Sequence, residues 1–272
     1  MDQVARTVLA LAILLLVAGV VPLVDGVRQA RAVVWSATRG AIQLLVVGLV
    51  LGAVFRAPLA VLPVLAVMVA AATATVTPRL AELPTRRRWW RPIAVVAAVT
   101  TGATVTTSVV FATGALALQV RNVVALVGIT VGGAMTASTL AGRRFVAELR
   151  GRRAEVEGKL ALGATTRQAT ADLVGVAVAE ALVPALDQTR TTGLVTLPGA
   201  FVGALFGGAS PLAAARFQLV VLVGLLAAES VAAVVLLRLL ADVPFLPVAA
   251  APAPSKPAPT ARWGIRPAFW RR

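Results

Sequence analysis

Long uninterrupted runs of apolar residues dominate this chain and limit the folds that it can adopt. Seven such blocks lie at 7–24, 38–55, 58–77, 92–113, 123–141, 192–208 and 212–240. A helix needs about 20 apolar residues to cross a bilayer, so each block is predicted to be a membrane-spanning helix. Only 14% of the residues are charged, where a soluble domain carries about a quarter. The sequence therefore predicts an all-α, polytopic membrane bundle of about seven helices and excludes a soluble enzyme.

The distribution of basic residues predicts the orientation of this bundle, because Lys and Arg collect on cytoplasmic loops. If the N-terminus is outside, the segments inside are 25–37, 78–91, 142–191 and the chain from Arg238 onward, and they hold nearly all 26 Lys and Arg residues. The cations left over are Arg6, Arg56, Arg121 and Arg216 outside, and Arg39 within a span. We expect the N-terminus outside, the C-terminus inside, and a multi-pass protein of the cytoplasmic (inner) membrane. This asymmetry accounts for the net charge of +15, so nucleic acid is not an expected partner.

We expect the chain to divide into a membrane domain, 1–241, and a tail, 242–272. The tail is rich in Pro, Ala and basic residues, a composition that cannot bury a core, so it is predicted to be disordered on the cytoplasmic side. Its Trp263, Trp270 and arginines suit anionic membrane lipid, and a solvated tail is an equal alternative. There is no Cys or His, which removes thiolate and imidazole chemistry from the chain.

The one long polar stretch, 143–183, has a helical pattern with a sharp break. Leu149, Val156 and Leu160 lie on one face, and the first helix is predicted to end at Gly163. Thr165, with Gln168 three residues later, predicts a capping box that opens a second helix, expected to stop at Pro184. This coupling segment, as we call 143–183, is either a connector that covers the bundle or a docking element for a partner.

Three stretches resemble the FetB-type ABC transporter permeases: VVWSATRGAIQLLVVGLVL, GKLALGATTRQAT and ALVPALDQTRTTGLVTLPGAFVGALFGGASPLAAARFQLVV. The resemblance covers most of 33–238, in a family of bacterial iron exporters and plant half-transporters linked to aluminium tolerance. It implies a homodimeric permease subunit that works with a separate ABC ATP-binding subunit, which binds ATP and Mg. Accordingly the chain has no GxxxxGK[ST] phosphate loop, and we expect no catalytic residue or cofactor in it. The coupling segment is similar to the coupling loop of bacterial importers, which implies coupling roles for Glu155, Glu157, Gly163, Ala164 and Thr165.

Polar residues within the blocks are candidates for a transport pathway or gate, because polar groups are costly in a bilayer. Arg39 and Gln43 lie one turn apart, although Arg39 is near enough to the end of its block to reach the headgroups. Glu229 is too deep for that, so it is either half of an ion pair, with Arg39 as one option, or a cation site. Pro198 and Gly199 predict a kink, and Asp187 and Arg190 predict a gate or hinge.

The substrate is not defined by a ligand motif. The resemblance implies a metal ion or a metal-linked solute, with iron export as the family's activity. The only thioethers belong to Met1, Met68 and Met135, so a hard cation is the better fit, with oxygen ligands from Glu229, Thr106, Thr107, Thr136 and backbone carbonyls. Two other functions stay open. One is an ion-coupled secondary transporter with Glu229 as the coupling site, and the other is a membrane scaffold that recruits a soluble partner.

Overall fold

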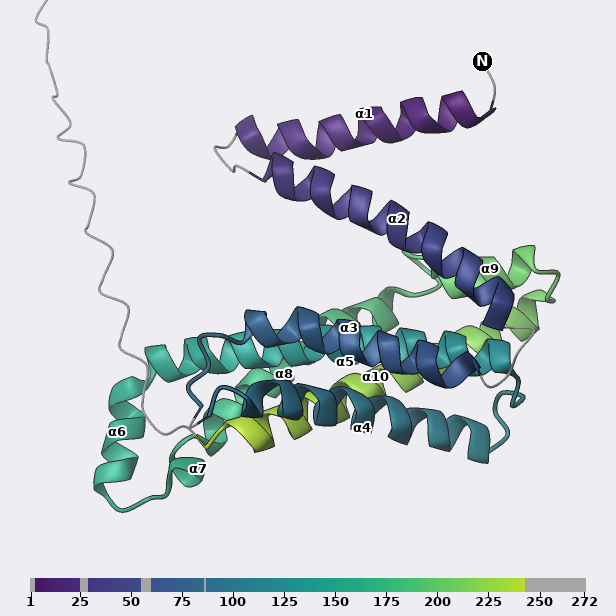
Figure 1. Ribbon diagram of the computed structural model, residues 1–272. Coiled ribbons are helices and arrows are strands. Elements are labelled where there is room, and N and C mark those ends of the chain that lie inside the picture. The colour runs from purple at the N-terminus through teal and green to yellow at the C-terminus, as the bar shows by residue number, and fades with distance from the viewer. Residues whose placement is uncertain (1–2, 25–28, 55–59, 86, 243–272) are drawn as a thin grey trace, which may run out of the picture. The chain divides into compact units, whose positions relative to one another are not determined.

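The computed structural model describes residues 3–24, 29–54, 60–85 and 87–242, and within them the chain is helical (Figure 1). The predicted disordered tail lies outside the described residues from 243 onward. The helices of the described part are α1 (Gln3–Val24), α2 (Ala30–Val54), α3 (Val61–Arg79), α4 (Trp90–Ala112), α5 (Val120–Gly151), α6 (Arg153–Ala161), α7 (Thr166–Ala169), α8 (Ala171–Thr191), α9 (Gly199–Phe206) and α10 (Pro211–Leu240). The prediction of an all-α membrane bundle is confirmed.

Six helices of the described residues are long and apolar enough to cross a membrane: α1, α2, α3, α4, α5 and α10. The prediction of a further span at 192–208 is wrong. Gly193 in this block has a φ of +89°, which ends the helical path, and Pro198 is extended. What remains helical there is α9, with only eight residues, which is far too short to cross a bilayer.

The chain divides into two compact units, which we describe separately. The first comprises Met1–Leu65 with Gln119–Val124, and therefore holds α1, α2 and the first turns of α3 and α5. Its small buried cluster joins Val61 of α3 to Val124 of α5, with Leu51 of α2 packed against it. Most side chains of α1 and α2 are exposed and apolar, as expected of helices that face lipid.

The second unit, Ala66–Leu118 with Ala125–Arg272, is built on an antiparallel pair of helices, α4 and α10. Small residues bring the two backbones together, because a Cβ on Gly102 would lie 2.5 Å from the carbonyl oxygen of Ala228. One turn further along α4, the Thr106 hydroxyl donates a hydrogen bond of 3.3 Å to the Gly224 carbonyl. Close approach through small residues and a hydroxyl bond is the usual way for helices to associate in a membrane.

Several polar contacts join the ends of this unit's helices at one end of the unit. We call it the elbow end, because the sharp turn of the coupling segment lies there. The Trp90 indole N–H at the start of α4 donates to the Leu239 carbonyl at the end of α10, at 3.3 Å. Arg150 near the end of α5 pairs with Glu82 after α3, at 3.0 Å. Helices α6 and α7 lie at the same end, with α9 at the opposite end (Figure 1). The described residues of 78–91, those around 152–170 and those of 238–242, all predicted to be cytoplasmic, thus share one end.

Helix α8 differs from the prediction that it would stop at Pro184 on the cytoplasmic side. It continues through Pro184 to Thr191 and packs along α10 with a stripe of small or apolar side chains, namely Leu173, Ala177, Ala181 and Ala185. This burial stabilises the helix against the backbone hydrogen bond that proline removes. The helix contains four charged residues, Asp172, Glu180, Asp187 and Arg190, so the hydropathy pattern did not mark it as an apolar block.

Candidate functional site

The predicted turn between the two helices of the coupling segment is confirmed in detail. Gly163 has a φ of +89°, its N–H donates to the Leu160 carbonyl at 3.0 Å, and the Ala164 N–H donates to the Lys159 carbonyl at 3.1 Å. This is the Schellman arrangement, in which a left-handed residue closes a helix. Thr165 then opens α7 with the predicted capping box to Gln168. We call α6, this turn and α7, residues 153–169, the elbow.

The acidic residues assigned to coupling are engaged in ion pairs on the surface of α6. Glu155 accepts hydrogen bonds from Arg152 at 2.7 Å and contacts Lys159 at 3.0 Å, while Glu157 accepts from Arg153 at 2.7 Å. Hydrogen bonds from Lys159 and Arg152 hold the pKa of Glu155 below its usual value. Hydrogen bonds to Asp172 and Glu155 raise the pKa of Lys159. The Glu155 charge is lost only as the pH falls through its lowered pKa, and the Lys159 charge only as it rises through the raised one, so the pair persists at neutral pH.

Further polar contacts join the elbow to α8 and α10. Lys159 of α6 pairs with Asp172 of α8 at 2.6 Å, and Arg167 of α7 donates to the Arg238 carbonyl of α10 at 3.1 Å. Above the elbow, Arg144 of α5 pairs with Glu180 of α8 at 2.6 Å. These contacts join the elbow to α8 and α10, and α8 to α5.

Leu162, at the tip of the elbow, was not among the predicted coupling residues. Its side chain is 90% exposed beside Gly163. Leu149 and Val156 are buried, as the apolar face of the coupling segment predicted. The sequence held one signal for an exposed leucine here. Leu162 comes directly before the glycine that ends α6, and the helical pattern placed Leu160, not Leu162, on the apolar face.

At the other end of α8 the backbone leaves the helix for seven residues before α9 begins. Thr192 is extended, Gly193 is left-handed with its N–H donating to the Thr196 carbonyl at 2.9 Å, and Thr192 and Thr196 form an isolated bridge. Pro198 is extended and α9 starts at Gly199. The kink predicted at Pro198–Gly199 is therefore a break, and it begins earlier than the proline. We call residues 192–198 the broken segment.

Asp187 and Arg190 lie on the last turns of α8, with 3.6 Å between their charged groups. Both side chains are open on the surface, at 60% and 74% exposed. They lie on α8, which packs along α10. Their predicted role as a gate or hinge stays a prediction.

Glu229 is buried in α10, with 8% of its surface exposed, as its position in the last apolar block predicted. Space for its carboxylate comes from Gly133 of α5, where a Cβ would lie 2.7 Å from Oε1 of Glu229. Within the described residues no ion pair reaches Glu229. Gln218, three turns earlier on the same face of α10, is also buried, and its side-chain oxygen has no hydrogen-bond partner in the part described. Gln218 and Glu229 are 11 residues apart, which is about three helical turns, so this spacing could have placed them on one face from the sequence alone.

Two of the other predicted ligands donate their hydroxyl hydrogen bonds elsewhere. Thr106 donates to the Gly224 carbonyl at 3.3 Å, and Thr136 donates to the Gly132 carbonyl at 3.1 Å within its own helix. The Thr107 hydroxyl oxygen is buried and has no hydrogen-bond partner among the described residues. Arg39 and Gln43 are exposed on α2, in the other unit, so pairing of Arg39 with Glu229 stays a prediction. Across the residues that the structure describes, no group of three or more His, Cys, Asp and Glu side chains could hold a metal ion.

Comparison with known proteins assigns the chain to a family. The model of the uncharacterised protein family UPF0014 matches residues 5–245. The chain is 31% identical over 232 residues to "Probable iron export permease protein FetB" of Escherichia coli, covering 84% of this chain and 87% of that protein. It is 35% identical over 202 residues to the rice membrane protein STAR2, covering 74% and 69%. It is 32% identical over 203 residues to "Protein ALUMINUM SENSITIVE 3" of Arabidopsis thaliana, covering 74% and 72%.

No solved structure matches the chain. The helices long and apolar enough to cross a bilayer agree with the membrane proteins among these relatives. The chain is thus a multi-pass membrane protein that belongs to the UPF0014 family.

Proposed function

We propose that this chain is the permease subunit of an ABC transporter in the cytoplasmic membrane, which works as a homodimer with two copies of a separate ATP-binding subunit. The observation that carries the proposal is the elbow. It is a rigid turn at the end of the bundle, closed by Gly163 and capped by Thr165, with an exposed leucine at its tip. An exposed apolar side chain surrounded by charged groups on a rigid support is typical of a docking contact.

The contacts of the elbow supply a route from ATP hydrolysis to the membrane. Closure of the two ATP-binding subunits would displace α6 and α7, and the Lys159–Asp172 pair carries that motion into α8. Helix α8 leads directly into the broken segment and α9. Rigid helices that end in an irregular segment can rearrange between two discrete states. The elbow is thus the input, and the broken segment is the element that opens and closes.

The charged pair on α8 supports a homodimer. Asp187 and Arg190 are exposed on α8, which packs along α10, a helix suited to span the membrane. If α8 also lies in the membrane in the assembled transporter, these charged side chains avoid lipid and face protein or a water-filled cavity. A second copy related by two-fold symmetry presents Arg190 to Asp187 and Asp187 to Arg190, so the surface is complementary to itself. We place the transport pathway along this face, with Pro198 and Gly199 at the break next to it.

The transported species in this proposal is a metal ion or a metal-linked solute, exported from the cell. The name of the bacterial relative refers to iron export. Two separate places offer oxygen ligands that suit a hard cation, the Glu229 carboxylate buried in α10 and the backbone carbonyls of the broken segment. Glu229 with its neighbour Gly133 is the place to test for substrate contact.

Purification in mild detergent tests the central claim. Wild-type chain should retain an ABC ATPase, and Gly163→Val should lose it by about 5- to 30-fold, because a left-handed conformation costs a residue with a side chain about 1–2 kcal/mol. Gly158→Val is the matched control. Gly158 lies in the same helix α6, has open space around it and no positive φ, so a β-branched residue there is tolerated.

Two outcomes contradict the proposal. Equal ATPase recovery with Gly163→Val and Gly158→Val would mean that the elbow is only a connector. If no ATPase accompanies folded wild-type protein, the ion-coupled alternative takes precedence. Its observation is the buried Glu229, and its signature is gradient-driven transport that Glu229→Gln abolishes.

A further inference from the structure

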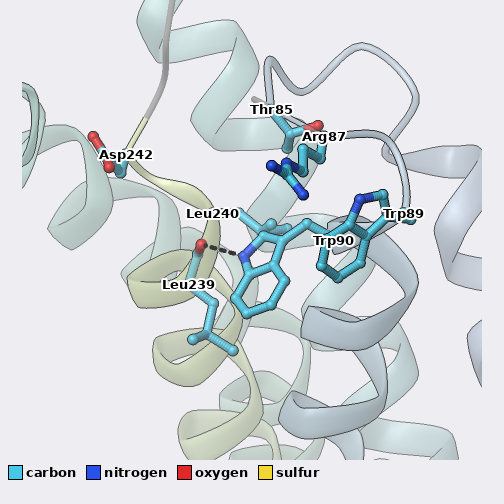
Figure 2. Close-up of a pocket in the computed structure, with 7 residues that line it drawn as sticks. All are labelled: Thr85, Arg87, Trp89, Trp90, Leu239, Leu240 and Asp242. Carbon is cyan, nitrogen blue, oxygen red and sulfur yellow. Dashed lines mark hydrogen bonds between the residues drawn. The ribbon is translucent and has the colours of Figure 1, made fainter.

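A cavity of about 370 Å³ lies at the elbow end of the second unit, between the start of α4 and the end of α10 (Figure 2). Its walls consist of Thr85, Arg87, Trp89, Trp90, Leu239, Leu240 and Asp242. Neither the elbow contacts nor the proposed transport pathway involves these residues. The cavity therefore calls for a separate explanation.

The walls combine a fixed aromatic frame with one cation. The rings of Trp89 and Trp90 pack edge to face with 5.7 Å between their centroids, and the Trp90 N–H is held by the Leu239 carbonyl. The Arg87 guanidinium carbon lies 5.7 Å from the centre of the Trp89 ring. In Figure 2, Arg87 extends between Thr85 and the Trp90 ring, while Asp242 lies on the far side of the cavity. No ion pair joins Arg87 to Asp242 among the described residues, so the cation is available to a ligand.

The cavity lies at the level where two membrane helices leave the apolar layer. Helix α4 begins at Trp90 and α10 ends at Leu240, and both are long and apolar enough to span a bilayer. Tryptophan concentrates at that level because its ring is apolar and its N–H is polar. Arg88 and Arg91 on the same short stretch add positive charge, and the Thr85 hydroxyl is buried with no hydrogen-bond partner in the described part of the chain. A ligand there meets the Arg87 cation and the Thr85 hydroxyl, with the Asp242 carboxylate on the far side of the cavity, and it meets tryptophan and leucine on its apolar side.

We propose that this cavity binds the headgroup of an anionic phospholipid, with the phosphate at Arg87 and the acyl chains along Trp90 and Leu239. Basic pockets between membrane helices recognise such headgroups. The chain's own tail is an unsuitable occupant, because residues 243–272 contain basic residues but no Asp or Glu. A zwitterionic phospholipid offers Arg87 the same phosphate but adds a cation close to Arg87, Arg88 and Arg91, whereas an anionic lipid adds none. The predicted orientation assigns the site to the cytoplasmic leaflet, and the proposal rests on membrane insertion alone, not on the transport function.

Native mass spectrometry of the delipidated full-length chain tests the site by titration with phosphatidylglycerol and with phosphatidylcholine of the same acyl chains. Wild type should bind phosphatidylglycerol more tightly, and Arg87→Gln should weaken this binding about fivefold, the effect of one arginine near a membrane surface. Arg87→Lys should restore most of it. Arg216→Gln, the same change at the opposite end of α10, is the control for lost charge and should bind like wild type.

Three results would overturn the proposal. They are equal binding of the two lipids by wild type, equal losses in Arg87→Gln and Arg216→Gln, and displacement of bound phosphatidylglycerol by an excess of free glycerol phosphate. The last would identify a site for a soluble phosphate rather than a lipid. Because Arg87 is exposed, unchanged thermal unfolding of Arg87→Gln is expected and serves as the check on folding.

Discussion

The exposed apolar side chain of Leu162 is unfavourably hydrated, and burial against a partner would remove this free-energy cost. Burying a leucine contributes about 1.5–3 kcal/mol, so Leu162→Gln should weaken binding of the ATP-binding subunit by about 10- to 100-fold. The stability of the chain alone should stay the same, because the side chain is 90% exposed. Leu194→Gln is the control, since that leucine is 92% exposed but lies in the broken segment. Titration of purified permease with its ATPase measures both, and equal binding by the two variants would refute a contact at Leu162.

Gly133 makes a second prediction at the scale of single residues. A Cβ there would contact Leu225 and lie 2.7 Å from Oε1 of Glu229, so Gly133→Ala should force α5 and α10 apart. Overpacking of this kind costs about 1–3 kcal/mol, and the melting temperature in detergent should fall. Gly132→Ala adds the same methyl group one residue earlier, where nothing lies within 4 Å, and should keep or slightly raise the melting temperature, because alanine favours a helix more than glycine does. A fall of equal size in both variants would mean that the fit around Glu229 does not determine the effect.

The helices of the coupling segment separate what local sequence predicts from what it does not. The end of α6 at Gly163 and the capping box of Thr165 were predicted correctly, because caps depend on residues within one turn of each other. The course of α8 was not. Pro184 indicates a stop in isolation, and the charges of α8 resemble those of a soluble loop. The stripe of small residues that packs on α10, and the pairing of Glu180 with Arg144, are tertiary facts that outweigh both signals.

The broken segment shows the opposite error. An apolar run of 17 residues predicted a span at 192–208, although it contains the helix-breaking pairs Thr192–Gly193 and Pro198–Gly199. Hydropathy measures the environment of a segment and not its backbone path. Non-helical backbone at membrane depth is tolerated where protein or water satisfies its polar groups, and here Gly193 and Thr196 bond to each other. The kink predicted from Pro198 was in the right place, but the non-helical stretch is longer than a kink and starts at Thr192.

For the whole molecule, the orientation depends on whether α8 crosses the membrane. With the six apolar helices alone, both termini would lie on one side of the membrane. If α8 also crosses, the N-terminus is outside and the elbow end is inside, which is the orientation that the basic residues predict. A helix that crosses with Asp187 and Arg190 exposed is stable only beside another polar surface. In the proposed dimer, orientation and dimerisation would therefore be linked, because α8 would both complete the topology and need a partner.

Thiol cross-linking in native membranes tests this link, and the chain is suited to it because it contains no Cys. Val183 lies one turn before Asp187 on α8 and is 46% exposed, so Val183→Cys should give a cross-linked dimer with a short bifunctional maleimide. Val223→Cys is the matched control, since Val223 is 54% exposed on α10. If α8 faces a second copy and that face of α10 faces lipid, only Val183→Cys cross-links. Cross-linking of Val223→Cys alone would move the dimer interface to α10, and α8 would then have to border a water-filled pathway within a single protomer.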